Sequence, residues 1–294
     1  MRTETRRSID PRTDLGYVHL TVADLNRSLN FYTEVLGLQV HQREGNRARL
    51  GVGDEDLLVL TGSPGAKPRP RNTTGLYHFA ILLPDRASLA RSLRQLVKKD
   101  YPLWGASDHL VSEALYLDDP DGNGIEIYRD RPRSEWRWRE GQVEMDTRRL
   151  DLRELLGEPG AERLWAGLPA GTSLGHVHLH VRDLAEAERF YHETLGFDVM
   201  TRYGGQALFV SAGGYHHHIG LNTWAGVGAP PPPSGSAGLR WFTVRLPEEL
   251  ELERVVRRLR EAGVPFEEKP GSVSLHDPSS NGIRITEGDV AGST

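Results

Sequence analysis

The chain opens on a period-two pattern of apolar and polar residues. The stretch YVHLTV (17–22) alternates in this way, which is typical of a β-strand with one buried face. Apolar residues then recur every three or four positions, which predicts a helix that begins after an N-cap at Asp24 and ends near Gly37. The predicted buried face of this helix consists of Leu25, Leu29, Tyr32 and Leu36. Three strand-like stretches follow (LQVHQREG, RARLGVG and DLLVLTG), so the segment predicts one βαβββ unit.

The same pattern then restarts. YHFAILLP predicts a strand, RASLARSLRQLVKK a helix, and SEALYLDDPDGNGIEIYRD a hairpin that turns at Asp-Gly-Asn-Gly. Residues 174–199 also repeat residues 15–40 at a constant offset of 159, so that His178 matches His19 and Gly196 matches Gly37. Two later segments repeat as well, GLYHFAILLP as GLRWFTVRLP and LDDPDGNGIEI as LHDPSSNGIRI. The chain is therefore predicted to be an α+β protein of four βαβββ units.

The repeat divides the chain into two predicted domains. We expect an N-terminal domain over 11–130, a charged linker over 131–172 and a C-terminal domain over 173–288. Within the linker a short helix is expected near Asp151–Leu156, and Trp136 and Trp138 are expected to dock on a domain surface.

Composition narrows the classes of function. The chain has 294 residues, with 36 Lys and Arg against 41 Asp and Glu, a net charge of −5 that argues against a nucleic-acid partner. It contains no Cys, which excludes disulfides, thiolate catalysis and Fe–S clusters. No apolar run is long enough for a transmembrane helix, and the N-terminus lacks the apolar stretch of a secretory signal. We therefore expect a cytoplasmic protein without a membrane partner.

The four units carry a family resemblance. HLTVADLNRSLNFYTEVLGL near the start and DPDGNGIEIY near residue 120 resemble the vicinal oxygen chelate (glyoxalase/bleomycin resistance/dioxygenase) superfamily. The two-domain arrangement is similar to type I extradiol ring-cleavage dioxygenases of the catechol 2,3-dioxygenase kind. The resemblance implies tandem domains with U-shaped sheets. The fold also carries isomerases, lyases, thiol transferases and non-catalytic drug-binding proteins, so the fold alone does not fix the reaction.

The resemblance implies a metal site inside one U-shaped sheet. We assign its ligands to His19, His78 and Glu126, at corresponding positions of the first two units. Two neutral imidazoles and a carboxylate on one face of the ion suit non-heme Fe²⁺, because substrate and O₂ can bind opposite them; Mn²⁺ or another divalent ion would also fit. Family isomerases of the glyoxalase type draw a fourth ligand from the last strand of the first unit. Here that strand, DLLVLTG, has no ligand-type residue, which favours a dioxygenase.

The second half lacks the matching set. Trp241 stands where the first half has His78, and Arg284 stands where it has Glu126. An Arg cannot ligate iron, so the metal is expected in the N-terminal half, unlike the best-known two-domain extradiol enzymes. The second half is rich in His nonetheless, which leaves open a second metal site or a hydrogen-bonded polar pocket. Those residues are His176, His178, His180, His216, His217 and His218.

Two further residues are candidates for catalysis. Tyr116 precedes Glu126 by ten residues on the adjacent strand, a spacing at which a Tyr of extradiol enzymes contacts the substrate oxygens. His109 precedes the same strand and is inferred to transfer protons near neutral pH. It stands in for the family's own acid–base His, because residues 61–75 contain none.

The resulting hypothesis is an Fe²⁺-dependent extradiol dioxygenase of aromatic catabolism that acts on a catechol-type substrate with O₂. The resemblance also suggests a homo-oligomer. Two alternatives stay open at this point: a non-catalytic small-molecule-binding protein, and a metal-dependent isomerase or lyase.

Overall fold

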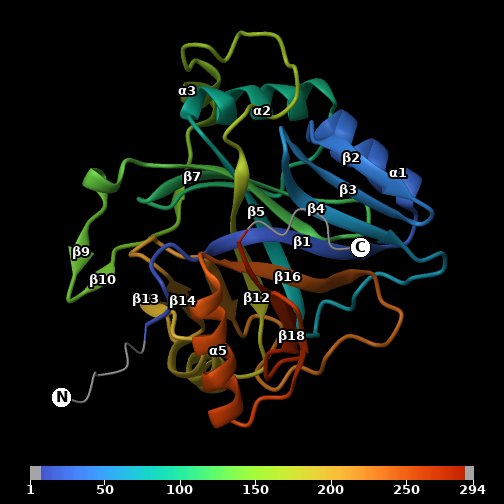
Figure 1. Ribbon diagram of the computed structural model, residues 1–294. Helices are drawn as coiled ribbons and strands as arrows, with labels where there is room; N and C mark the ends of the chain where they lie inside the picture. The colour runs from blue at the N-terminus through green and yellow to red at the C-terminus, as the bar shows by residue number, and fades with distance from the viewer. Residues whose placement is uncertain (1–7, 289–294) are drawn as a thin grey trace.

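The computed structural model describes residues 8–288 and contains the four predicted βαβββ units (Figure 1). In the first unit the Asp24 side chain accepts a hydrogen bond from the backbone N–H of Arg27, as an N-cap does, and Gly37 ends the helical segment at a φ of +84°. The elements of the first unit are β1 (Asp14–Val22), α1 (Leu25–Asn30) with a π-helical turn over Phe31–Val35, β2 (Gln39–Glu44), β3 (Arg47–Val52) and β4 (Glu55–Gly62). Those of the second unit are β5 (Gly75–Leu83), α2 (Arg86–Lys98), β6 (Gly105–Asp108), β7 (Ser112–Asp118) and β8 (Gly124–Asp130).

The second half repeats this order. Its third unit consists of β12 (Ser173–His180), α4 (Leu184–Glu188) with a π-helical turn over Arg189–Thr194, β13 (Asp198–Tyr203), β14 (Ala207–Ser211) and β15 (Ile219–Asn222). Its fourth unit consists of β16 (Gly238–Leu246), α5 (Glu249–Glu261), β17 (Phe266–Lys269), β18 (Ser272–His276) and β19 (Gly282–Glu287). No helix within residues 8–288 is long and apolar enough to cross a membrane.

The connecting segment has more structure than a plain linker. It contains the predicted short helix, α3 (Leu152–Leu156), with Asp151 as its N-cap. It also contains a 3₁₀ turn at Arg133–Glu135 and the short strands β9 (Trp138–Arg139), β10 (Gln142–Val143) and β11 (Arg148–Arg149). Of its two tryptophans, Trp136 is buried, as expected for docking, whereas Trp138 is half exposed.

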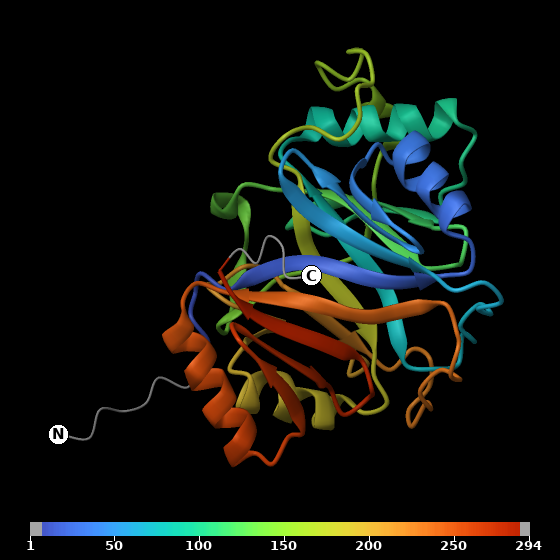
Figure 2. The same ribbon diagram turned by 45° about the vertical axis from the view of Figure 1, so that its right-hand side comes forward.

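The sheets combine the units across the two halves. β1 of the first half pairs antiparallel with β16 of the second half, and β5 of the first half pairs antiparallel with β12 of the second half. The first and fourth units therefore share an eight-stranded sheet, and the second and third units share a nine-stranded one that β11 extends. Figure 2 shows β1 beside β16, and both strands cross over β5 and β12. The four units open on similar strands, so the sequence repeat does not determine which of these strands pair.

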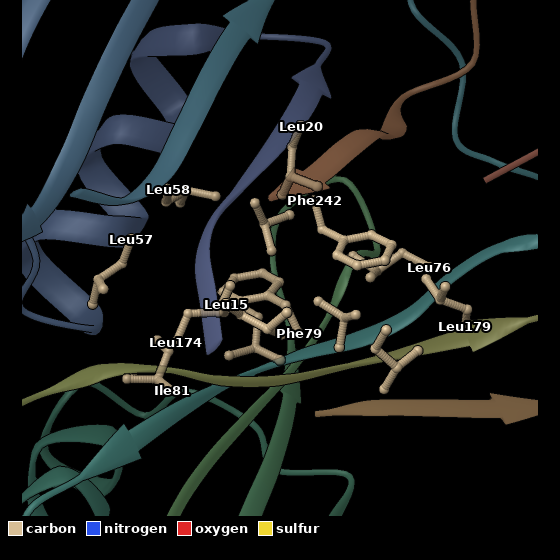
Figure 3. Close-up of a cluster of buried hydrophobic side chains, with 14 of the residues drawn as sticks. Leu15, Leu20, Leu57, Leu58, Leu76, Phe79, Ile81, Leu174, Leu179 and Phe242 are labelled. Carbon is tan, nitrogen blue, oxygen red and sulfur yellow. The ribbon is translucent and has the colours of Figure 1, made fainter. Parts of the chain in front are cut away.

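The two sheets pack against each other through their apolar faces. Figure 3 shows Leu20 and Phe242 of the first sheet meeting Leu76, Phe79 and Leu179 of the second, all within one continuous hydrophobic core. Because strand side chains alternate, the residues between these positions point to the opposite faces of the sheets. Each outer face carries a polar cluster. The second-sheet site contains His78, Glu126 and His176, and the first-sheet site contains His19, Trp241 and Arg284.

Candidate metal centre and cavity

Three ligand-type side chains meet on the outer face of the second sheet. They are His78 of β5, Glu126 of β8 and His176 of β12, all buried. The Nε2 atoms of His78 and His176 lie 3.0 Å and 3.1 Å from the Glu126 Oε2. The two Nε2 atoms are 3.3 Å apart. This triangle of donor atoms forms the core of the second-sheet site.

Strand register produces this convergence. Ala80 of β5 lies opposite Glu126 in the parallel pair with β8 and opposite His176 in the antiparallel pair with β12. His78 is two residues before Ala80 and so shares its face. The small methyl group of Ala80 leaves space above it. The longer side chains of His78, Glu126 and His176 converge in that space.

The electrostatics keep these groups in a form able to bind a metal. Burial lowers the pKa of His78, so its imidazole is neutral near pH 7. Burial alone would raise the pKa of Glu126, but His176 and His78 outweigh that effect and hold the pKa well below its ordinary value. Glu126 is therefore a buried carboxylate between two imidazoles.

The donor set fits a divalent cation. With metal–ligand distances of about 2.1 Å, ligands at right angles lie about 3.0 Å apart, close to the spacing of the three donor atoms. Two imidazoles and one carboxylate also form the set expected on one face of a non-heme Fe²⁺ ion. Glu126 and His78 border a cavity of about 270 Å³, so ligands have room to reach the open side of such an ion.

Aromatic side chains form much of the cavity wall. Trp104, Trp224 and Tyr203 are each roughly half exposed at its edge, and Tyr77 and Phe209 lie further in. The connecting segment contributes Met145, Asp146 and Thr147, so this segment belongs to the site as well as joining the two halves. A flat apolar ring would find stacking partners here.

The two residues predicted for catalysis meet in this cavity. The Tyr116 hydroxyl lies 2.6 Å from Nε2 of His109, and Nδ1 of His109 lies 2.8 Å from the backbone carbonyl of Asp146. A carbonyl only accepts, so Nδ1 of the neutral imidazole carries the proton and Nε2 accepts from Tyr116. Burial, followed by the charge of Glu126, raises the pKa of Tyr116 well above its ordinary value and keeps the hydroxyl protonated.

The sequence reasoning did not assign a role to His217, which also borders the cavity. Its ring packs on His176 at a centroid distance of 4.1 Å. Its Nδ1 lies 2.8 Å from Nδ1 of His216, whose Nε2 lies 2.9 Å from the Asp130 carboxylate. Asp130 accepts from His216, so His216 Nδ1 accepts from His217 and leaves the His217 Nε2 as a free acceptor. The signal was the His run itself, which placed three imidazoles on one short stretch.

His19 is not part of this centre. It lies in β1 of the other sheet, where its Nε2 is 2.8 Å from the Thr61 hydroxyl and its ring meets Trp241 edge-on. The structure does not bring His19 to His78 and Glu126, because the predicted ligand set assumed pairing between the first and second units. The partner of β5 is β12, so the third ligand-type side chain is His176, one of the His of the second half for which the sequence left a role open.

The predicted loss of ligands at Trp241 and Arg284 applies to the sheet that contains His19. Arg284 lies over the ring of Trp241 at 4.4 Å, and His19 packs on the same ring at 4.1 Å. The first-sheet site therefore consists of residues from the first and fourth units, where an arginine takes the place of the carboxylate.

Known proteins match most of this chain. The model of the Glyoxalase/Bleomycin resistance protein/Dioxygenase superfamily matches residues 14–127 and 173–276. A Catechol-2,3-dioxygenase of Bacillus subtilis (strain 168) is 52% identical over 283 residues, which are 95% of this chain and 98% of that protein.

Solved structures agree on the fold. A structure from Bacillus subtilis subsp. subtilis str. 168 superposes with a TM-score of 0.67 at 15% identity, over 97% of this chain and 87% of that one. Glyoxalase I from Zea mays superposes with a TM-score of 0.58 at 17% identity, over 94% of this chain and 92% of that one. The predicted resemblance is confirmed, and the chain belongs to the Glyoxalase/Bleomycin resistance protein/Dioxygenase superfamily.

Proposed function

We propose that this protein is an Fe²⁺-dependent extradiol dioxygenase that opens a catechol-type ring with O₂ and holds its metal with His78, Glu126 and His176. The observation that carries the proposal is the buried triangle of donor atoms, 3.0–3.3 Å apart, beside an aromatic-walled cavity. The 52% identity to a Catechol-2,3-dioxygenase supports the same reaction class. His176 replaces His19 in the ligand set given by the sequence.

The bound ion would supply a Lewis acid for the two vicinal oxygens and an electron path to O₂. The remaining contributions come from the chain. The aromatic wall orients the ring, and the buried setting of His78 and Glu126 keeps water from competing for the site. Mn²⁺ in the same ligand set is the alternative metal.

Two groups are placed to handle protons. Nε2 of His217 is the free acceptor of the Asp130–His216–His217 chain and takes a proton from a substrate hydroxyl. The Tyr116 hydroxyl, oriented by Nε2 of His109, holds a substrate oxygen next to Glu126. The role of His109 in this proposal is to orient Tyr116 as well as to exchange protons with it.

Loading purified apoprotein with Fe²⁺ under anaerobic conditions and then adding catechol and air tests the proposal. We expect oxygen uptake that matches formation of a yellow ring-cleavage product. His176→Ala should lose metal and activity, whereas the matched variant His19→Ala should keep both. Full activity with a redox-inert ion would instead indicate an isomerase or lyase. Substrate binding without metal dependence would indicate a binding protein.

Two predictions about the whole protein accompany this proposal. Self-association is expected from the family and is measured by light scattering. A cytoplasmic location is measured by fractionation of cells that produce the protein.

A further inference from the structure

The first-sheet site corresponds in position to the proposed metal centre of the second sheet, but it carries a positively charged side chain where that centre carries a carboxylate. Arg284 of β19 lies opposite Thr243 of β16, as Glu126 of β8 lies opposite Ala80 of β5. Trp241 stands at the position of His78, and Tyr17 at that of His176. A carboxylate that would attract a cation is thus replaced by a guanidinium that attracts an anion.

A cavity of about 330 Å³ borders this site. Its wall includes Tyr17, Arg47, Thr243 and Arg284, which come from β1, β3, β16 and β19. Arg47 lies opposite Thr61, the residue that contacts His19, so its strand brings a second guanidinium to the same face. The cavity therefore lies over strands of both the first and the fourth unit.

Several buried polar atoms at this site have no partner within the described part of the chain. They are Nε of Arg47, Oγ1 of Thr243, Nε1 of Trp241 and Nδ1 of His19. Thr243 and His19 are each only 2% exposed. Two of these residues, Arg47 and Thr243, border the cavity. Leaving a buried donor unpaired costs about 1–3 kcal/mol, so these two donors indicate a ligand that accepts hydrogen bonds.

The charge balance of the cavity is positive beside Arg47 and Arg284. Of its acidic residues, Glu55 pairs with Arg245 and Asp56 pairs with Arg49, while Asp54 is exposed in the turn before β4. Within residues 8–288, Arg47 and Arg284 have no carboxylate in ion-pair range. Burial, followed by the charges of Arg240, Arg47 and Arg284, lowers the pKa of His19 to about 3, which agrees with an uncompensated positive field.

We propose that the first-sheet cavity is an anion-binding site, in which Arg47 and Arg284 hold a small oxyanion (a carboxylate or a phosphate) and the Thr243 hydroxyl donates to it. Guanidinium groups match the planar oxygens of these anions in pairs. The site is separate from the proposed catalytic centre, because the two lie on opposite outer faces of the packed sheets.

Calorimetric titration of the full-length protein with malonate, and separately with inorganic phosphate, tests this proposal. We expect saturable binding of one anion per chain, with tighter binding of malonate indicating a carboxylate site and tighter binding of phosphate a phosphate site. Arg47→Met and Arg284→Met should each weaken binding by about tenfold or more, because each removes a charge-assisted hydrogen bond. Arg284→Lys keeps the positive charge but loses the paired N–H donors of the guanidinium. Its affinity for the anion should therefore lie between those of the wild type and Arg284→Met.

The matched control is Arg257→Met, which removes an exposed arginine of α5 that does not border the cavity. It should bind the anion like the wild type, and all variants should retain metal content and ring cleavage. No saturable binding of either anion with a Kd below about 10 mM would overturn the proposal. Equal loss in the Arg257→Met control would also overturn it, because binding would then follow net charge and not the cavity.

Discussion

The outer faces of the two sheets are built on corresponding strands of the repeat, but their side chains carry opposite charges. In the second sheet, His78, Glu126 and His176 bring three donor atoms within 3.3 Å of one another. In the first sheet, Trp241 and Arg284 stand at the positions of His78 and Glu126. The backbone register is alike, so the side chains alone decide which ion each face accepts.

The comparison also shows what a metal centre requires beyond its ligands. Ala80 leaves space between Glu126 and His176, whereas the equivalent position in the first sheet holds Thr243. A branched side chain there would fill part of the volume over which the ligands lean. Restoring a metal site to the first sheet would thus require a smaller residue at this position as well as new ligands.

Removing a proposed metal ligand should have the largest effect on metal binding and activity. It tests most directly whether the two sheet faces differ in function. Glu126→Gln keeps the shape of the side chain but removes the charge, and should weaken Fe²⁺ binding more than about 100-fold, with loss of ring cleavage. Metal analysis after dialysis measures this. Arg284→Gln, which removes one unit of the opposite charge on the other face, should leave Fe²⁺ binding unaltered; a matching loss there would show that the two faces are not independent.

Changes to the proton-handling groups should have the next largest effect. His217→Gln should lower kcat by about 10²-fold or more with Fe²⁺ still bound, because it removes the free acceptor. Tyr116→Phe should lower kcat without loss of metal, and Tyr101→Phe is its control, since the Tyr101 hydroxyl donates to the Asp118 backbone away from the cavity. Unchanged steady-state rates in His217→Gln would contradict the assigned role.

A smaller effect is expected at Asp130, which fixes the tautomer of His216 and through it that of His217. Asp130→Asn should lower kcat by about tenfold with little change in KM, comparable to other losses of an orienting hydrogen bond. Asp130→Glu should recover part of the rate. A fall in thermal stability with kcat unchanged would instead indicate that Asp130 has a structural role.

The smallest effect on catalysis is expected at the first-sheet site, where the prediction concerns stability instead. His19 has a pKa of about 3 in the folded protein, against about 6.5 when unfolded. Between these values the unfolded chain takes up a proton that the folded chain does not, so the free energy of unfolding falls as the pH falls, by up to about 1.4 kcal/mol per pH unit from this group. His19→Gln should remove that contribution, as urea denaturation at pH values from about 7 to 4 would show. Parallel pH profiles for the variant and the wild type would contradict the prediction.

Local structure could be predicted from the sequence, but the partners of each strand could not. The N-cap at Asp24 and the C-terminal Gly37 were correct because they depend on neighbouring residues. The structure brings His78 and Glu126 together, and the sequence could suggest this pair because both residues lie within one unit. His19 was misplaced because its partner strand lies more than 200 residues away, and the repeat makes several pairings look alike.

The role of the connecting segment was also beyond sequence reasoning. Its charged and irregular composition gave no sign that Met145, Asp146 and Thr147 would border the cavity. The backbone carbonyl of Asp146 even fixes the tautomer of His109, a contact that depends on position and not on side-chain type. Such backbone contacts leave no pattern in the residues themselves.

The pairing of the outermost units has a consequence for biogenesis. The strand that completes the sheet begun by β1 is β16, which starts at Gly238, so the first unit leaves the ribosome long before its partner strand exists. The inner pair, β5 and β12, can join earlier and assembles the His78, Glu126 and His176 group once β12 is made. We therefore expect the proposed metal centre to form on a nascent chain in which β1 has paired with β4 but one edge of β1 still lacks its partner, a period in which chaperones would protect that edge.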